Sequence, residues 1–437
     1  MQRRSFSLIL AASFLIFNVK VSEANPSKGL SLEEATQILL QQNPELKAMK
    51  KESEAAQAKV PQAKGWDDPQ VGVRFYQVPF GEGLGKAMDI DYIASQKIPF
   101  PGKKKAAGQI AYHEYLHHLE SLNARGRQLV REMKTVYYKL FVLDRQLAQS
   151  FKLQKLLLGW IQSAQANLSS GQGMASEVVQ AQTELAKQGI ERESLQAQRA
   201  ILETQLRQIL ASSEIATIQL PNKLDLPQWN RPLEKLEAMA QSRHSDLKLA
   251  QHQIGQKNWA IKAAKREYLP DLSTQLEYVQ RPGGQQDAWT GEFMVNLPLQ
   301  VAKKKGAVTQ AKAELSSAEY AYESAKNKVS AQVKQAYLKT KTAEKVFKLY
   351  DKSLIPQAQQ AVEMSSVAYS TQQAPLSNLL NAEQALLNAQ KDYWQAYEDF
   401  LVSLAELEEA IGISWENMDE ALTQPDINPQ GSRVEGK

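Results

Sequence analysis

The sequence predicts an elongated, mostly α-helical protein with a small membrane-inserted β part, built from two copies of one layout. Three observations lead to this fold class. The chain repeats itself at a spacing of about 200 residues. Each copy contains two segments in which polar and apolar residues alternate, and each copy then continues through long stretches with few helix breakers.

The composition narrows the class of protein before any motif is considered. Of the 437 residues, 23% are charged and 43% are hydrophobic. This balance excludes a disordered chain and a helical membrane protein with many spans. The net charge of +4 is small for the length and is not typical of nucleic-acid binding. The absence of cysteine excludes disulfides, thiolate metal sites and a lipid-acylated N-terminal cysteine.

The N-terminus predicts export. Residues 1–24 combine two arginines, Arg3 and Arg4, with an apolar run over 6–19 and small residues before a cut after Ala24. This is the pattern of a secretory signal peptide. The apolar run is shorter than the roughly 20 residues that a spanning helix needs. No later stretch is long and apolar enough for such a helix, so we expect any membrane insertion to use strands.

The internal repeat defines the domain organisation. Leu32 aligns with Leu233, and Lys47 with Lys248, at a constant shift of 201. The expected units are a first repeat over 25–220, a proline-rich linker over 221–232, a second repeat over 233–412 and a polar tail over 413–437 that we expect to be disordered.

Each repeat is expected to contain a helix, a β-hairpin and two long helices. The expected elements are a helix over 31–66, a hairpin over 70–98 and helices over 103–168 and 176–210, followed in the second repeat by a hairpin over 271–297 and helices over 303–368 and 377–411. Ser176 is expected to cap its helix. Pro356 is expected to kink the helix that contains it, because a proline inside a helix removes a backbone hydrogen bond.

The alternating segments predict strands with one apolar face. Val71, Val73 and Phe75 alternate with Gly72 and Arg74, and the other three segments follow the same pattern. Each is about 9 to 11 residues long, which suffices for a tilted strand to cross a bilayer. A half-buried sheet of an ordinary globular domain is the alternative. Four strands cannot close a barrel, and open edges in lipid leave backbone groups unsatisfied, so we expect several copies to complete one barrel.

Over about residues 30–412 the chain resembles the outer-membrane efflux proteins of the TolC type. The resemblance rests on the duplicated layout, on "NPELK" (43–47) and on "IPFPGKKKA" (98–106). Two longer stretches, 354–370 and 376–412, also match the family. It implies a homotrimer with a twelve-strand barrel in the outer membrane and an α-helical tunnel through the periplasm. Such a protein conducts cargo passively, has no catalytic residues and needs no cofactor.

The resemblance also implies partners. In this family the periplasmic helix tips meet an adaptor protein, which connects the duct to an inner-membrane pump, here expected to be of the resistance-nodulation-division class. The positions that match the two tips are Gly171, Gly173, Ser176, Glu177, Val178, Ser370, Gln373, Leu376, Ser377 and Leu379. Plain turn and capping chemistry explains the same residues. The second turn lacks the acidic ring of many relatives, so Gln372 and Gln373 are the gate candidates.

A single sequence feature gives information about the cargo. The "PGKKKA" junction at 101–106 looks most like the branch that serves exporters of heavy-metal cations. The same lysines would also suit the lipid interface, where cationic anchors are expected. Ducts for multidrug or type I secretion exporters are the alternatives.

One motif points to a different function. His113, Glu114 and His117 form H-E-x-x-H, the pattern of zinc peptidases in which the glutamate is the general base. Such enzymes need a third protein ligand, and the next histidine after this segment is His244, in the other repeat. We therefore expect incidental, solvent-facing histidines, although His113 and His117 could hold Zn²⁺ or Cu²⁺ as a pair. A periplasmic coiled-coil scaffold without strands is a further alternative.

Overall fold

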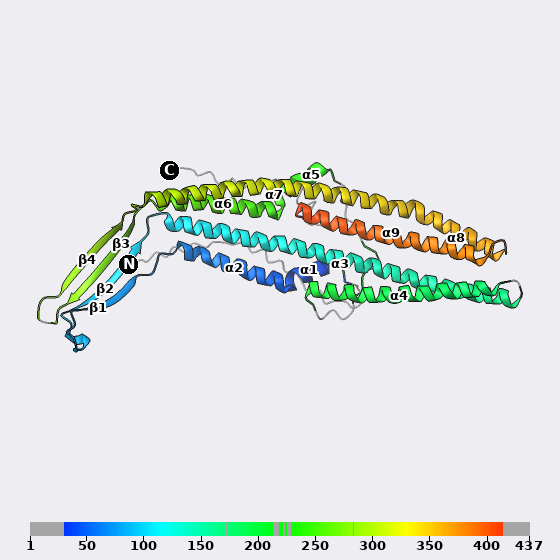
Figure 1. The fold of residues 1–437 in the computed structure, drawn as a ribbon, viewed down its shortest axis with the longest axis horizontal. Coiled ribbons are helices and arrows are strands. Elements are labelled where there is room, and N and C mark those ends of the chain that lie inside the picture. The colour runs from blue at the N-terminus through cyan, green and yellow to red at the C-terminus, as the bar shows by residue number, and fades with distance from the viewer. Residues whose placement is uncertain are drawn as a thin grey trace, which may run out of the picture.

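The computed structural model describes residues 30–413, except 172, 213–217, 222, 225–228, 230 and 283. The predicted signal peptide and all but the first residue of the predicted tail lie outside the described residues. The protein is a long rod with a β-sheet at one end. At the other end are two turns, one between α3 and α4 and one between α8 and α9 (Figure 1). Within the described residues, none of the helices combines the length and apolar character that a membrane span requires.

The first repeat contains the elements that its sequence predicts, with one helix divided in two. They are α1 (Leu32–Gln42), α2 (Pro44–Lys64), β1 (Gln70–Tyr76), the 3-10 turn η1 (Leu84–Lys86), β2 (Asp89–Ile98), α3 (Lys103–Ser169) and α4 (Ala175–Leu210). The prediction of a single helix over 31–66 is wrong, because Asn43 separates α1 from α2. Its side chain accepts hydrogen bonds from the backbone N–H groups of Glu45 and Leu46. A residue before proline is disfavoured in helical conformation, so Pro44 starts a new helix.

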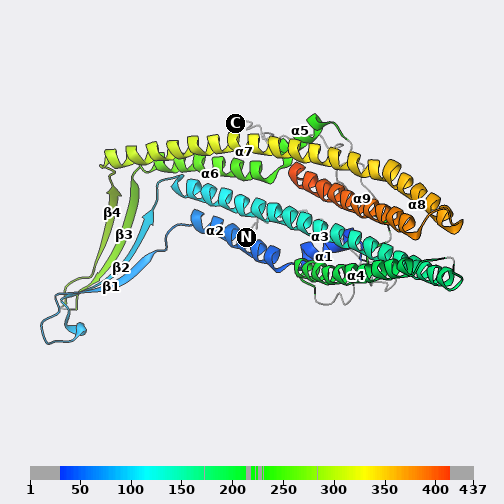
Figure 2. The ribbon, with the colours of Figure 1, turned by 45° about the vertical axis from the view of Figure 1, so that its right-hand side comes forward.

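The second repeat follows the same plan. Its elements are α5 (Leu233–Arg243), α6 (Ser245–Arg266), β3 (Asp271–Gln280), β4 (Ala288–Asn296), α7 (Val301–Leu349), the π-helical turn η2 (Tyr350–Leu354), α8 (Ile355–Ser370) and α9 (Leu376–Ile411). The kink predicted at Pro356 falls where the α-helix is broken, because η2 ends at Leu354 and Pro356 lies in the first turn of α8. A π-turn is locally wider than an α-helix, and it lies directly before Pro356, which has no N–H to donate. Figure 2 shows α7 leading into α8 along a bent path.

The long helices set the dimensions of the rod. With 67 residues, α3 is about 100 Å long at 1.5 Å per residue. It lies against α2 and α6 in the half nearer the sheet, and against α4 and α9 in the other half. The shift of 201 holds for whole elements, because α5, α6 and α9 begin 201 residues after α1, α2 and α4.

The sheet joins the two repeats. Its order is β1-β2-β3-β4, and every neighbouring pair is antiparallel. The register places Val73 opposite Tyr92, Tyr92 opposite Tyr278 and Tyr278 opposite Trp289. Residues directly opposite each other share a face, so the apolar positions of all four strands lie on one side. The predicted alternation is confirmed.

In the described part of the chain, three apolar clusters lie along the rod. One packs α1, α3 and α4 around Leu39 and Tyr137, and a second packs α5, α7 and α9 around Phe400. Leu401 and Ala405 of α9 belong to the first of these, so the second repeat helps to cover the core of the first. The third cluster lies at the two helical turns.

Candidate functional site

The sheet has a polar face that is held together by one arginine. Arg74 of β1 contacts Asp91 of β2 through its Nε atom at 2.8 Å, and its guanidinium also binds Glu277 of β3. Asp91 is only 4% exposed. Because a carboxylate loses solvation when it is buried, the arginine compensates both acids, and the ion pairs connect the hairpins of the two repeats.

The opposite face of the sheet is apolar and largely uncovered in the single chain. Val71, Leu276, Trp289 and Phe293 are all exposed. Trp289 packs on Tyr278 with ring centroids 4.9 Å apart. A soluble monomer rarely exposes an apolar surface that extends across four strands, so this face is suited to an apolar environment.

The predicted lysine cluster lies where the sheet meets the helices. Lys103 is 2.9 Å from Asp271 of β3, and Lys104 is 2.9 Å from Asp67. Lys304 donates to the backbone carbonyl of Glu267. Lys103 therefore fastens the first turn of α3 to β3, and Lys104 and Lys304 bind the segments that lead into β1 and β3.

The two turns at the far end of the rod share one backbone design. Gly171 has φ of +73°, and Gln372, 201 residues later, has φ of +59°. The N–H of Gln373 donates to the Ala368 carbonyl at 2.8 Å, and the N–H of Gln372 donates to the Tyr369 carbonyl at 3.0 Å. This is a Schellman C-cap, in which a left-handed residue ends the helix. Glutamine takes the position where glycine would be unstrained.

Side chains tie the two turns to each other. Glu177 of α4 accepts a hydrogen bond from the backbone N–H of Leu376, the first residue of α9, at 3.2 Å. Asn167 of α3 is 3.4 Å from the Tyr369 hydroxyl of α8. A carboxylate at a helix N-terminus is favourable, because the first N–H groups have no partner within the helix. The first repeat therefore caps a helix of the second.

The predicted tip residues divide into exposed and buried groups. Gly171, Ser176, Ser370 and Gln373 are exposed, as is Gln372. Gly173, Glu177, Val178 and Ser377 are half-buried. Leu376 and Leu379, however, are 0% and 1% exposed.

Two of the expectations for the tips need correction. Leu376 and Leu379 pack against Ile161, Ala164 and Ala181 inside the chain, so they stabilise the paired turns and do not face a partner. The apolar spacing of α9 predicts such buried positions. Ser176 is not a cap, since α4 begins at Ala175 and Met174 precedes it without a side-chain hydrogen bond.

Sequence reasoning missed several exposed apolar residues at the tips. Met174 is 70% exposed and Val179 is 59% exposed beside the first turn, and Val367 is exposed beside the second. Methionine adapts to irregular partner surfaces. The helical period would have identified Val179 as outward-facing, because Val178 and Ala181 point into the tip cluster.

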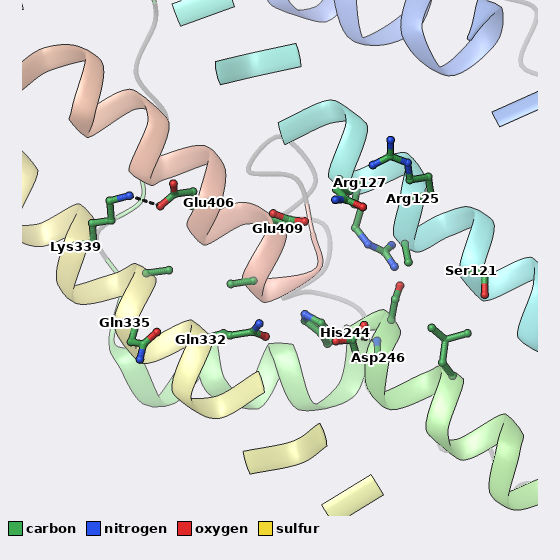
Figure 3. Close-up of a pocket in the computed structure, with 16 residues that line it drawn as sticks. Ser121, Arg125, Arg127, His244, Asp246, Gln332, Gln335, Lys339, Glu406 and Glu409 are labelled. Atoms are coloured by element: carbon green, nitrogen blue, oxygen red, sulfur yellow. Dashed lines mark hydrogen bonds and ion pairs between the residues drawn. The ribbon is translucent and has the colours of Figure 1, made fainter. Parts of the chain in front are cut away.

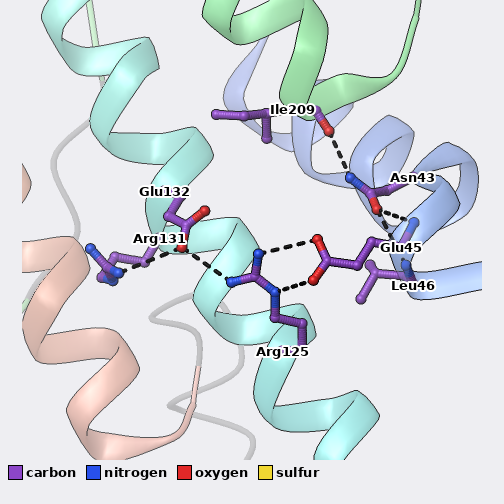
Figure 4. A network of polar contacts seen from close by, with 7 residues as sticks. All are labelled: Asn43, Glu45, Leu46, Arg125, Arg131, Glu132 and Ile209. Atoms are coloured by element: carbon purple, nitrogen blue, oxygen red, sulfur yellow. Dashed lines mark hydrogen bonds and ion pairs between the residues drawn. The ribbon is translucent and has the colours of Figure 1, made fainter. Parts of the chain in front are cut away.

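The middle of the rod contains two equivalent junctions between helices. In the first repeat, Asn43 caps α2 and donates to the Ile209 carbonyl in the last turn of α4 at 3.0 Å (Figure 4). Beside it, Glu45 holds Arg125 through two contacts of 2.6 and 3.1 Å, and the pKa of Glu45 is lowered by these hydrogen bonds. Arg125 also contacts Glu132 at 3.2 Å.

In the second repeat a histidine takes the place of Asn43. His244 Nδ1 accepts a hydrogen bond from the Asp246 N–H at 3.1 Å and so caps α6. It lines a cavity of about 580 Å³ between α3, α6, α7 and α9, together with Arg127 and Glu409 (Figure 3). Burial lowers the pKa of His244. Gly412, at the end of α9, lies against its backbone.

Among the residues that the structure describes, the H-E-x-x-H segment is joined by no third protein ligand of the kind that a catalytic zinc site needs. Glu114 is paired with Lys59 of α2 at 3.2 Å. In the described part of the chain, no group of three or more histidine, cysteine or acidic side chains could hold a metal ion. The expectation that the histidines face solvent holds for His117 but is wrong for His113, which is half-buried between α3 and α6.

Comparison with known proteins agrees with this architecture. The family model described as outer membrane efflux protein matches residues 35–212 and 236–413, one segment in each repeat. No curated protein gives a significant match. The matched residues make up most of the chain, which therefore belongs to the outer membrane efflux protein family, the family of TolC-type channels.

Solved structures with the same fold are distant in sequence. The outer membrane protein VceC from Vibrio cholerae is 17% identical with a TM-score of 0.72, covering 88% of this chain and 96% of its own. CusC, whose structures concern folding and transmembrane channel formation, is 15% identical with a TM-score of 0.74 over 91% and 96%. The CmeC outer membrane channel of Campylobacter jejuni is 14% identical with a TM-score of 0.72 over 91% and 90%. At these identities the likeness shows the fold alone.

Proposed function

We propose that this protein is the outer-membrane exit duct of a tripartite efflux system. It works as a homotrimer, conducts cargo passively from a periplasmic adaptor and an inner-membrane pump to the exterior, and performs no chemistry of its own. The supporting observation is a four-stranded sheet with one exposed apolar face, at the end of a helical rod about 100 Å long.

The edges of the sheet support the trimer. Among the described strands, β1 and β4 each have a single neighbour, so each leaves one row of backbone groups without a strand partner. Such edges are untenable in lipid, where no water can replace the missing hydrogen bonds. Three copies joined from β1 to β4 make a closed twelve-strand barrel, a size common among outer-membrane barrels. The apolar face then contacts lipid, and Arg74 with its two acids faces the lumen.

Disulfide crosslinking tests this closure directly, because the natural chain contains no cysteine. Gly72→Cys on β1 is combined in turn with Thr290→Cys, Glu292→Cys or Met294→Cys on β4. All four positions lie on the polar face of the sheet. Mild oxidation of outer membranes should give covalent dimers and trimers for at least one combination.

The control is Gly72→Cys alone, which offers one thiol per chain and cannot link three copies. If oxidation leaves all three double variants as monomers, the β1-to-β4 closure is refuted. Recovery of the wild type as a soluble periplasmic monomer would refute the duct itself.

We further propose that the tips meet the adaptor. The exposed and half-buried tip residues of the candidate set form this surface, with Met174, Val179 and Val367 added and Leu376 and Leu379 removed. Gln372 and Gln373, at the second turn, are the proposed gate.

Ser176→Arg should abolish export by the assembled system while the trimer remains intact on gels. The matched control is Ser163→Arg, an exposed position on α3 that lies farther from the tip, which should leave export unchanged.

For the cargo we propose heavy-metal cations, supported by the resemblance of the junction at 101–106 to the metal-exporting branch. Deletion of the gene should lower the resistance of its host to metal salts and leave its resistance to dyes and detergents unchanged. The opposite result would assign the duct to a multidrug system. Loss of secretion of a protein substrate would assign it to type I secretion.

A further inference from the structure

The histidines of this chain gather on two neighbouring helices. His113, His117 and His118 lie on α3, His252 lies on α6, and His244 is the N-cap of α6. The two helices belong to different repeats and lie side by side. Five histidines in 437 residues are few, so their placement on one helix pair is a feature to be explained.

One pair approaches across the boundary between the repeats. The imidazole rings of His113 and His252 have centroids 6.3 Å apart and are inclined by 44°. His113 is pressed against α6, because a Cβ at Gly255 would lie 2.3 Å from its Cε1 atom. Glycine at this position therefore makes room for the ring.

The ring of His113 is incompletely satisfied. Its Nδ1 atom is buried and has no hydrogen-bond partner among the described residues. An unsatisfied buried polar atom destabilises the folded protein, because it has lost its hydrogen bonds to water. Glu114, the next residue in the sequence, is paired with Lys59. A bound ion or water would remove this cost.

We propose that His113 and His252 form a binding site for a transition-metal cation such as Zn²⁺ or Cu²⁺, which links the two repeats. Imidazole suits both ions. Two metal–nitrogen bonds of about 2.0–2.1 Å keep the ligating atoms within about 4 Å of each other. A centroid separation of 6.3 Å is compatible with two imidazole rings that share one ion, and water completes the coordination.

The chemistry of the surroundings supports ligation. Burial lowers the pKa of His113 and of His252, so both rings are neutral at pH 7 and can offer a lone pair. The site lies on the helices between the sheet and the mid-rod cavity. It is independent of the cargo, and its role is to brace α3 against α6.

Calorimetric titration of the full chain tests the proposal. The protein is purified in detergent, stripped of metal with a chelator and titrated with ZnCl₂ and, separately, CuCl₂. One ion should bind per chain. His113→Gln and His252→Gln should each weaken binding at least tenfold, whereas the control His118→Gln, about 140° around α3 from His113, should bind as the wild type does.

A second comparison separates this site from a pair on α3 alone. His117→Gln should change affinity less than threefold. If His117→Gln abolishes binding while His252→Gln does not, the ion is held by the H-E-x-x-H histidines and the proposal fails. It also fails if the wild type shows no saturable binding. His252→Gln changes a partly exposed side chain, so it remains informative if His113→Gln does not assemble.

Discussion

At the scale of single residues, the comparison between Asn43 and His244 is the most instructive. Both occupy the same place in the repeat, and both cap the helix that follows. Asparagine keeps its acceptor at every pH. Histidine loses it on protonation, because both ring nitrogens of the imidazolium are donors. The cap of α6 is therefore sensitive to pH, and the cap of α2 is not.

This difference leads to a prediction on acid stability. Burial depresses the pKa of His244 in the folded protein, so between this pKa and the ordinary value near 6.5 the unfolded chain binds more protons. The stability that His244 contributes is complete above about pH 6.5 and is lost as the pH falls through the folded pKa. His244→Asn should flatten the pH dependence of the thermal midpoint between pH 5 and 7. A midpoint that falls equally in both proteins would contradict this.

A second residue-scale prediction concerns Glu177. Its hydrogen bond to the Leu376 N–H crosses from one repeat to the other at the tip. Glu177→Ala should speed hydrogen exchange at the start of α9 by up to about tenfold, because the carboxylate is partly exposed and contributes about 1 kcal/mol. Ser176→Ala is the control. Unchanged exchange in Glu177→Ala would show that the apolar tip cluster alone holds the turns together.

At the scale of elements, the strands show which sequence patterns are decisive. Period-two alternation predicted both faces of the sheet, and the register confirms it at Val73, Tyr92 and Tyr278. The division of the first helix at Asn43 was missed although its signal, an N-cap residue followed by proline, is present in the sequence. Both features are local, and local features can be read from the chain.

The faces of the sheet lead to a prediction with a matched control. Leu276 and Gln275 are neighbours on β3 and point to opposite faces. Leu276→Arg places a charge on the proposed lipid face, where arginine costs about 2–4 kcal/mol near the bilayer centre. We expect loss of heat-modifiable trimer from the outer membrane for Leu276→Arg and normal assembly for Gln275→Arg. Equal assembly of the two variants would contradict the assignment of the faces.

At the scale of the whole molecule, a buried ion pair joins the repeats. Lys134 of α3 and Glu408 of α9 are 2.7 Å apart, and both are less than 9% exposed. Partly buried Arg131 and Glu409 meet beside them at 2.5 Å. Buried charges are tolerated only when paired, so these contacts specify how the helices of one repeat lie against those of the other.

The pair predicts a non-additive mutant cycle. Lys134→Met should destabilise the protein by about 3–5 kcal/mol, because it leaves Glu408 buried without its cation. The double variant Lys134→Met with Glu408→Leu should recover most of this loss. Thermal unfolding of the detergent-solubilised protein measures both. If the double variant is as unstable as the sum of the single variants, the pair is not coupled.

The sequence by itself determined the repeat, the helices and the strands, because helical period, strand alternation and caps act between residues close in the chain. The tertiary structure alone decided the contacts on which the sites depend. Lys134 and Glu408 are 274 positions apart, and Glu177 and Leu376 are 199 apart. Leu376 and Leu379 turned out to be buried, and His113 turned out to face His252, because long helices from different repeats pack together. Which faces meet in that packing depends on the fit of whole helices, and no short sequence pattern records it.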